Sequence, residues 1–124
     1  MRKWAVIYSS TTGNTKTIAE EIAGASGGDL FRVQDAPTDL SDYDVIALGY
    51  WLRRGGPDDL MKAYLPKVKG ARTVLFQTHG ADVGSEHAVT SFARAAYLLG
   101  ADCEILGTFS AQGKLSPALI ARRK

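Results

Sequence analysis

A cluster of hydroxyl side chains around one glycine has the composition of a phosphate-binding turn. The cluster lies between the apolar run Trp4–Tyr8 and a helical pattern, and its residues are Ser9, Ser10, Thr11, Thr12, Gly13, Asn14 and Thr15. Backbone N–H groups in such a turn converge on an anion, and the following helix adds the positive end of its dipole. The hydroxyls of Ser10, Thr11, Thr12 and Thr15 and the Asn14 amide can donate further hydrogen bonds. Gly13 lets the backbone approach a ligand closely. The predicted chemistry is phosphate binding without a metal or a fixed positive charge.

Two common phosphate loops do not fit this spacing. No Gly-Lys-Ser/Thr follows a leading glycine, as a Walker A loop requires, and Gly13 stands alone where a dinucleotide fingerprint needs three glycines. A turn rich in serine and threonine can also simply cap a helix. Because five hydroxyl-bearing residues surround one glycine, which is more than capping needs, we favour a ligand phosphate.

The spacing Ser10-x-Thr12-Gly13-Asn14-Thr15 resembles the FMN phosphate loop of the flavodoxin family, Ser/Thr-x-Thr-Gly-x-Thr. This resemblance implies FMN as the cofactor and a flavodoxin-like fold. In that family the first loop holds the FMN phosphate, and two later loops enclose the isoalloxazine ring.

Strand and helix patterns alternate along the chain. Continuous apolar runs predict strands buried on both faces at Trp4–Tyr8, 44–49 and Arg72–Thr78, and weaker runs predict edge strands at 30–33 and 104–110. Helices are predicted at 16–25, 58–66 and 85–99, with a single helical turn at 39–43 and a short last helix from Ser116. This order predicts an α/β fold, a doubly wound five-stranded parallel sheet of order 2-1-3-4-5, which places the less apolar strands at the edges.

Ligands of such sheets bind beyond the carboxyl ends of the strands, where the strand order reverses. There the turn 9–15 would meet the loops 50–57 and 79–84. By resemblance to flavodoxins, the cofactor-binding residues of these two later loops are Tyr50, Trp51, Leu52, Arg53, Gly55, Gly56, Thr78, His79, Gly80, Asp82 and Gly84.

Trp51 is the expected stacking partner of the flavin, with Tyr50 as the fallback, and such a contact is worth about 0.5–1.5 kcal/mol beyond burial. The alternative is that Trp51 only packs within its loop. Gly55 and Gly56 would let the backbone reorient near flavin N5, or serve a plain turn. His79 either contacts the flavin or points to solvent.

Arg53 and Arg54 depart from the family, whose members usually place acidic residues near the flavin to repel its reduced anion. One charge about 5 Å from the flavin, at an effective dielectric constant of ~20, contributes roughly 3 kcal/mol. For one electron this corresponds to an upper limit on the order of 140 mV. The alternative is two solvated arginines at a loop tip.

The 124 residues fit one domain, residues 1–124. The formal net charge of +2 is too small to indicate nucleic-acid binding. A single cysteine, Cys103, excludes an internal disulfide and is expected to be a small buried hydrophobe. No apolar run approaches the ~20 residues of a membrane span. We therefore expect a cytoplasmic monomer that binds neither nucleic acid nor membrane.

We expect an FMN-dependent carrier that shuttles electrons between redox partner proteins, rather than a stand-alone oxidoreductase. Neither catalytic side chains nor metal ligands are expected, because the flavin would do the chemistry. The alternative is an FMN-dependent oxidoreductase or reductase subunit that acts on a quinone- or tetrapyrrole-type acceptor. A third hypothesis is a module that has kept the fold and lost the flavin.

Two other families of similar size are excluded. A response-regulator receiver needs an acidic cluster at Ser9-Ser10 and a phosphoacceptor aspartate at Gly49-Tyr50. A low-molecular-weight phosphatase needs Cys-x5-Arg, but Phe109 stands where the arginine would be.

Overall fold

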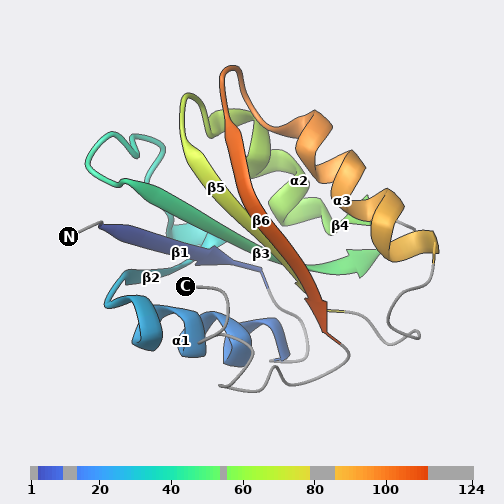
Figure 1. Ribbon diagram of the computed structural model, residues 1–124, viewed down its shortest axis with the longest axis horizontal. Helices are drawn as coiled ribbons and strands as arrows, with labels where there is room; N and C mark the ends of the chain where they lie inside the picture. The colour runs from blue at the N-terminus through green and yellow to red at the C-terminus, as the bar shows by residue number, and fades with distance from the viewer. Residues whose placement is uncertain (1–2, 10–13, 54–55, 79–85, 112–124) are drawn as a thin grey trace.

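The computed structural model describes residues 3–9, 14–53, 56–78 and 86–111. Their centre is a sheet in which five strands follow the order β2-β1-β3-β5-β6 (Figure 1). These strands are β1 (Trp4–Tyr8), β2 (Asp29–Arg32), β3 (Val45–Arg53), β5 (Arg72–Thr78) and β6 (Glu104–Ala111). Every pairing between neighbours in this order is parallel. Since β5 and β6 are the predicted fourth and fifth strands, the predicted order 2-1-3-4-5 is confirmed, edges included.

Helices cover both faces of the sheet. The helix α1 (Asn14–Ser26) lies on one face, and α2 (Asp59–Tyr64) and α3 (Glu86–Leu98) lie on the other (Figure 1). Two short 3-10 helices, η1 (Val33–Asp35) and η2 (Leu65–Lys67), follow β2 and α2. The fold is therefore the predicted doubly wound α/β architecture.

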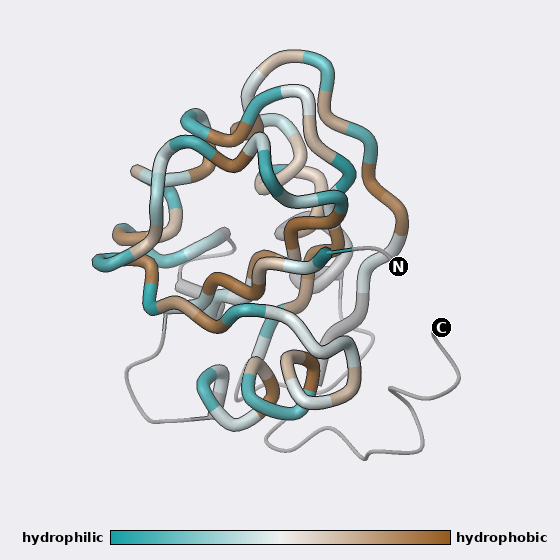
Figure 2. The backbone as a smooth tube through the Cα atoms, turned by 90° about the vertical axis from the view of Figure 1, so that its left-hand side faces the viewer, coloured by the Kyte–Doolittle hydropathy of each residue, from teal (hydrophilic) through white to brown (hydrophobic). Residues whose placement is uncertain are grey.

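The central strands alternate their side chains between two apolar layers. Ile46 and Leu48 of β3 pack with residues of α2 and α3, whereas Ala47 packs with residues of α1. All three are fully buried. Figure 2 shows the strand segments as largely hydrophobic and α1 as mixed, as expected for strands under helices on both sides.

β3 is longer than the sequence predicts. The expected strand ends at Gly49 and is followed by an irregular loop at 50–57, whereas β3 continues to Arg53. Its extension pairs first with the end of β5 and then, antiparallel, with the two-residue strand β4 (Gly56–Pro57). The prediction was wrong because glycine and proline, which are typical of turns, also occur in short edge strands.

Residues 39–43 form a turn instead of the predicted helical turn. The Ser41 N–H and hydroxyl both donate to Oδ1 of Asp39, at 3.1 and 2.7 Å. Such local side-chain bonds compete with helix formation, and the short helix in this connection is η1 instead.

The structure changes the predicted start of α1 and the predicted burial of Cys103. Two other predictions concern residues that it does not describe. α1 begins at Asn14, two residues before the predicted start at 16. Cys103 is half-buried against the core, and its thiol donates to the Val68 carbonyl at 3.2 Å. The predicted N-cap Ser85 and the predicted helix from Ser116 lie outside the described residues.

We expect Gly49→Ala to destabilise the protein, because the added Cβ would lie 2.1 Å from two ring carbons of Phe76. Phe76 is fully buried, so its ring cannot shift without disturbing a packed layer. The expected loss is about 1–3 kcal/mol in the free energy of unfolding, measured by urea denaturation.

Gly24→Ala is the control for this substitution. Gly24 is exposed in α1, and a Cβ added there meets nothing within 4 Å. Alanine in a helix interior is favoured over glycine by roughly 0.5–1 kcal/mol, so this variant should be the more stable one. A Gly49→Ala protein as stable as wild type would show that Phe76 does not pack over Gly49 as described.

Candidate cofactor site

The carboxyl ends of the three central strands β1, β3 and β5 lie side by side at one end of the sheet. Between β1 and β3 the strand order reverses, which is where doubly wound sheets bind ligands. The Ser9 N–H, directly after β1, donates to the Gly49 carbonyl of β3 at 2.9 Å. α1 starts at Asn14. The predicted phosphate turn is thus placed between a buried strand end and a helix N-terminus.

A buried hydrogen bond joins the first and third predicted loops. The hydroxyls of Thr15, in the first turn of α1, and Thr78, the last residue of β5, lie 2.8 Å apart. The two residues are 1% and 4% exposed. Either hydroxyl can be the donor, so this contact uses one of the two hydroxyl protons.

A second buried contact joins the first loop to the start of α2. The Ser9 hydroxyl donates to Oδ2 of Asp58, and Oδ1 of the same carboxylate accepts the Met61 N–H at 3.2 Å. Ser9 and Asp58 are each 1% exposed. Because Ser9 gives its hydroxyl proton to Asp58, that proton is not available to a phosphate. The prediction that Ser9 belongs to the cofactor site stays a prediction.

Sequence reasoning missed Asp58 as a residue of this site. The aspartate was expected to begin a helix, and the structure confirms it as the N-cap of α2. Its contact with Ser9 links positions far apart in the sequence, and no local pattern marks such a pair.

The alternation of β3 separates the two aromatic candidates. The Tyr50 side chain is fully buried in the layer with α2 and α3, so it cannot serve as the fallback stacking partner. Trp51 follows on the opposite face, is half-buried, and lies in register with Thr78 of β5. Its stacking on a flavin stays a prediction.

Of the other predicted site residues, some lie in the described ranges and the rest do not. Asn14 opens α1, and Leu52, Arg53 and Gly56 lie in the antiparallel pairing of β3 with β4. The remaining predicted residues lie outside the described ranges: Ser10, Thr11, Thr12, Gly13, Gly55, His79, Gly80, Asp82 and Gly84.

The described groups suit a phosphate ester such as that of FMN. The first turn of α1 carries no acidic side chain, and the backbone N–H groups of a helix N-terminus favour an anion. The Thr15–Thr78 contact joins that first turn to the end of β5. These groups would hold the phosphate, and Trp51 would contact the ring.

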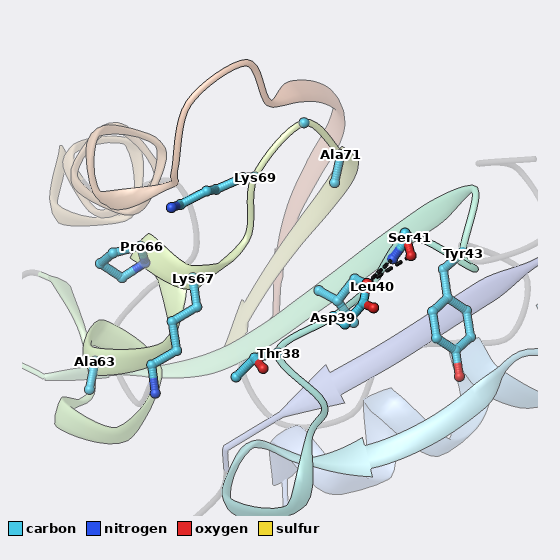
Figure 3. Close-up of a pocket in the computed structure, with 11 residues that line it drawn as sticks. Thr38, Asp39, Leu40, Ser41, Tyr43, Ala63, Pro66, Lys67, Lys69 and Ala71 are labelled. Carbon is cyan, nitrogen blue, oxygen red and sulfur yellow. Dashed lines mark hydrogen bonds between the residues drawn. The ribbon is translucent and has the colours of Figure 1, made fainter.

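A hollow of about 770 Å³ lies at the other end of the sheet (Figure 3). Its lining comes from two segments, one that leads into β3 and one that leads into β5: Thr38, Asp39, Leu40, Ser41, Tyr43, Ala63, Pro66, Lys67, Lys69, Gly70 and Ala71. Lys67 and Lys69 lie across from Asp39 and Ser41 (Figure 3). The Ser41 hydroxyl and N–H hold the pKa of Asp39 below its usual value. Because it lies at the amino ends of the strands, this hollow is separate from the predicted cofactor site.

No group of three or more histidine, cysteine, aspartate or glutamate side chains in the described ranges is placed to hold a metal ion. No helix in those ranges is both long and apolar enough to cross a lipid bilayer.

Solved structures share this fold over nearly the whole chain. The two-electron reduced flavodoxin of Megasphaera elsdenii superposes with a TM-score of 0.71 at 23% identity, covering 97% of this chain and 93% of that one. A flavoprotein of Lactobacillus acidophilus, solved in complex with FMN, gives a TM-score of 0.65 at 18% identity and covers 89% and 93%. At these identities the likeness establishes the fold.

Sequence comparison establishes the family. Residues 5–124 match the sequence model of the flavodoxin domain. The flavodoxin-like domain-containing protein BilS of Clostridioides difficile strain CD3 is 35% identical over 127 aligned positions, which cover 98% of this chain and 72% of that protein. Flavodoxin-family membership supports the FMN that the phosphate turn predicts. The chain belongs to the flavodoxin family.

Proposed function

We propose that this protein is an FMN-binding electron-transfer flavoprotein that carries electrons between redox enzymes. The observation that carries the proposal is the contact between Thr15 and Thr78, which joins the predicted phosphate turn to the end of β5 beside the N-terminus of α1. Membership of the flavodoxin family supports the same cofactor and the same role.

FMN, when bound, supplies the redox chemistry, since flavins accept and donate electrons. The protein binds and orients it. Backbone N–H groups at the start of α1 and the hydroxyls of residues 10–15 hold the phosphate, and Trp51 covers part of the ring. No described side chain is needed as an acid or a base.

As a carrier, the protein docks its redox partners through the flavin edge left exposed by these loops. The small positive net charge of +2 suits partners with acidic docking surfaces. We place the protein in the cytoplasm as a monomer, which leaves that edge free for each partner in turn.

The Thr12→Ala/Thr15→Ala double variant should lose most of its FMN affinity. Each substitution removes a hydroxyl predicted to bond the charged phosphate, and such a bond is worth about 1.5–3 kcal/mol. Together they should weaken binding at least about a hundredfold. The measurement is a titration of apoprotein with FMN, followed by flavin fluorescence and by the visible absorbance of the complex.

Thr38→Ala serves as the control, because Thr38 is an exposed threonine at the other end of the sheet. It should bind FMN like wild type. Unchanged affinity in the double variant would overturn the assigned phosphate site, and absence of FMN binding by the wild-type protein would overturn the proposed function.

Arg53→Glu should lower the potential of the second one-electron reduction of bound FMN. Arg53 lies at the end of β3, where the ring is predicted to bind. Each unit of positive charge removed near the ring disfavours the added electron by at most on the order of 140 mV. A spectroelectrochemical titration at low ionic strength measures the shift, because salt screens exposed charges.

Arg72→Glu is the matched control for net charge. Arg72 is exposed and begins β5, so it lies at the opposite end of the sheet. Its reversal should leave the potential nearly unchanged. Equal potentials for Arg53→Glu and wild type, or equal shifts for both variants, would show that Arg53 does not face the flavin.

A further inference from the structure

Asp58 is a buried carboxylate that the proposed electron transfer does not use. It is 1% exposed, although aspartate is rarely buried so fully without partners. Its two oxygens accept from two different elements, the Ser9 hydroxyl after β1 and the Met61 N–H of α2. An N-cap needs only the second of these bonds, so capping alone does not explain the first.

The position of Ser9 gives the first bond its significance. Ser9 directly precedes residues 10–13, where the phosphate is predicted to bind. On the other side of these residues, α1 begins at Asn14. Asp58 therefore holds one end of the predicted phosphate turn, and Thr78 holds the other through Thr15. Both contacts come from the segments that carry the other two predicted loops.

Electrostatics alone would disfavour a carboxylate at this place. A buried negative charge near the site repels a phosphate and is costly to desolvate. The benefit must come from geometry, because the two carboxylate oxygens of Asp58 accept from Ser9 and from Met61 at the same time. A side chain that bonds both partners at once holds the start of the turn against α2, which alanine at this position could not do.

We propose that Asp58 is a positioning residue for the phosphate turn and acts through Ser9, so that it favours FMN over riboflavin, which lacks the phosphate. The proposal rests on the proposed function, because it concerns the same cofactor site. Asp58 is assigned no contact with the cofactor itself.

The test compares the dissociation constants of FMN and riboflavin for wild type, Ser9→Ala, Asp58→Ala and the double variant. Each single variant should weaken FMN binding about tenfold, as expected for one buried hydrogen bond to a charged group. Riboflavin binding should change less than about threefold, because the turn contacts only the phosphate. The double variant should be no weaker than Asp58→Ala, since both changes remove the same contact.

Two further variants separate positioning from helix capping and from charge. Asp58→Asn can cap α2 through its amide oxygen and donate its N–H to Ser9, so it should bind FMN within about threefold of wild type. Asp59→Asn removes the neighbouring carboxylate at the exposed first turn of α2 and should leave the ratio of FMN to riboflavin affinity unchanged. Ser9→Ala leaves the cap of α2 intact, so it tests the proposal even if Asp58→Ala does not fold.

The outcomes distinguish this proposal from the one on which it rests. Failure of the wild-type protein to bind FMN would refute the function. Normal FMN binding by wild type, with Ser9→Ala and Asp58→Ala weakening FMN and riboflavin equally, would refute the positioning role alone. Additive losses in the double variant would refute it as well.

Discussion

Two buried hydrogen bonds join separate segments at the carboxyl ends of the strands. One links Ser9, after β1, to Asp58 at the start of α2, and the other links Thr15 of α1 to Thr78 at the end of β5. The Thr15–Thr78 bond between two neutral hydroxyls is worth about 1 kcal/mol net, and the Ser9 bond to the Asp58 carboxylate about 1.5–3 kcal/mol. A buried polar group left without a partner costs about 1–3 kcal/mol. The folded chain therefore cannot easily separate these elements. The strand order makes the arrangement possible, because it places the ends of β1, β3 and β5 side by side.

In the proposed site, this arrangement would hold the ends of the phosphate turn in place before the cofactor binds. Ordering a loop during binding reduces affinity, and a site whose ends are already held avoids much of that cost. The N-terminus of α1 supplies aligned N–H groups in the same place, so that an anion can be bound without a cation. Asp58 adds an opposing charge, and the geometry it enforces offsets that repulsion.

Much of this fold could be predicted from the sequence because its determinants are local. The apolar runs at Trp4–Tyr8 and Arg72–Thr78 became the buried strands β1 and β5, and the weaker runs became the edges. The composition of residues 9–15 indicated a turn between a strand and a helix, and the structure has β1 ending at Tyr8 before it and α1 beginning at Asn14. Asp58 was recognised as a helix start for the same local reason.

What the sequence could not supply depends on contacts between distant segments. The extension of β3 to Arg53 requires the pairing with β5 and β4, which no property of residues 50–57 reveals. The opposite placement of Tyr50 and Trp51 follows from that extension, because only a strand alternates its side chains. The link between Ser9 and Asp58 requires the ends of β1 and β3 to be neighbours, and so it emerges only from the folded chain.

The central claim is that a turn held at both ends binds the cofactor phosphate at the head of α1. A crystal structure of the protein grown with excess FMN tests it most directly. We expect the phosphate to lie against residues 10–15, with the Ser9–Asp58 and Thr15–Thr78 contacts intact and the ring beside Trp51. A phosphate bound elsewhere, such as in the hollow beside Lys67 and Lys69, with the head of α1 left empty, would contradict it.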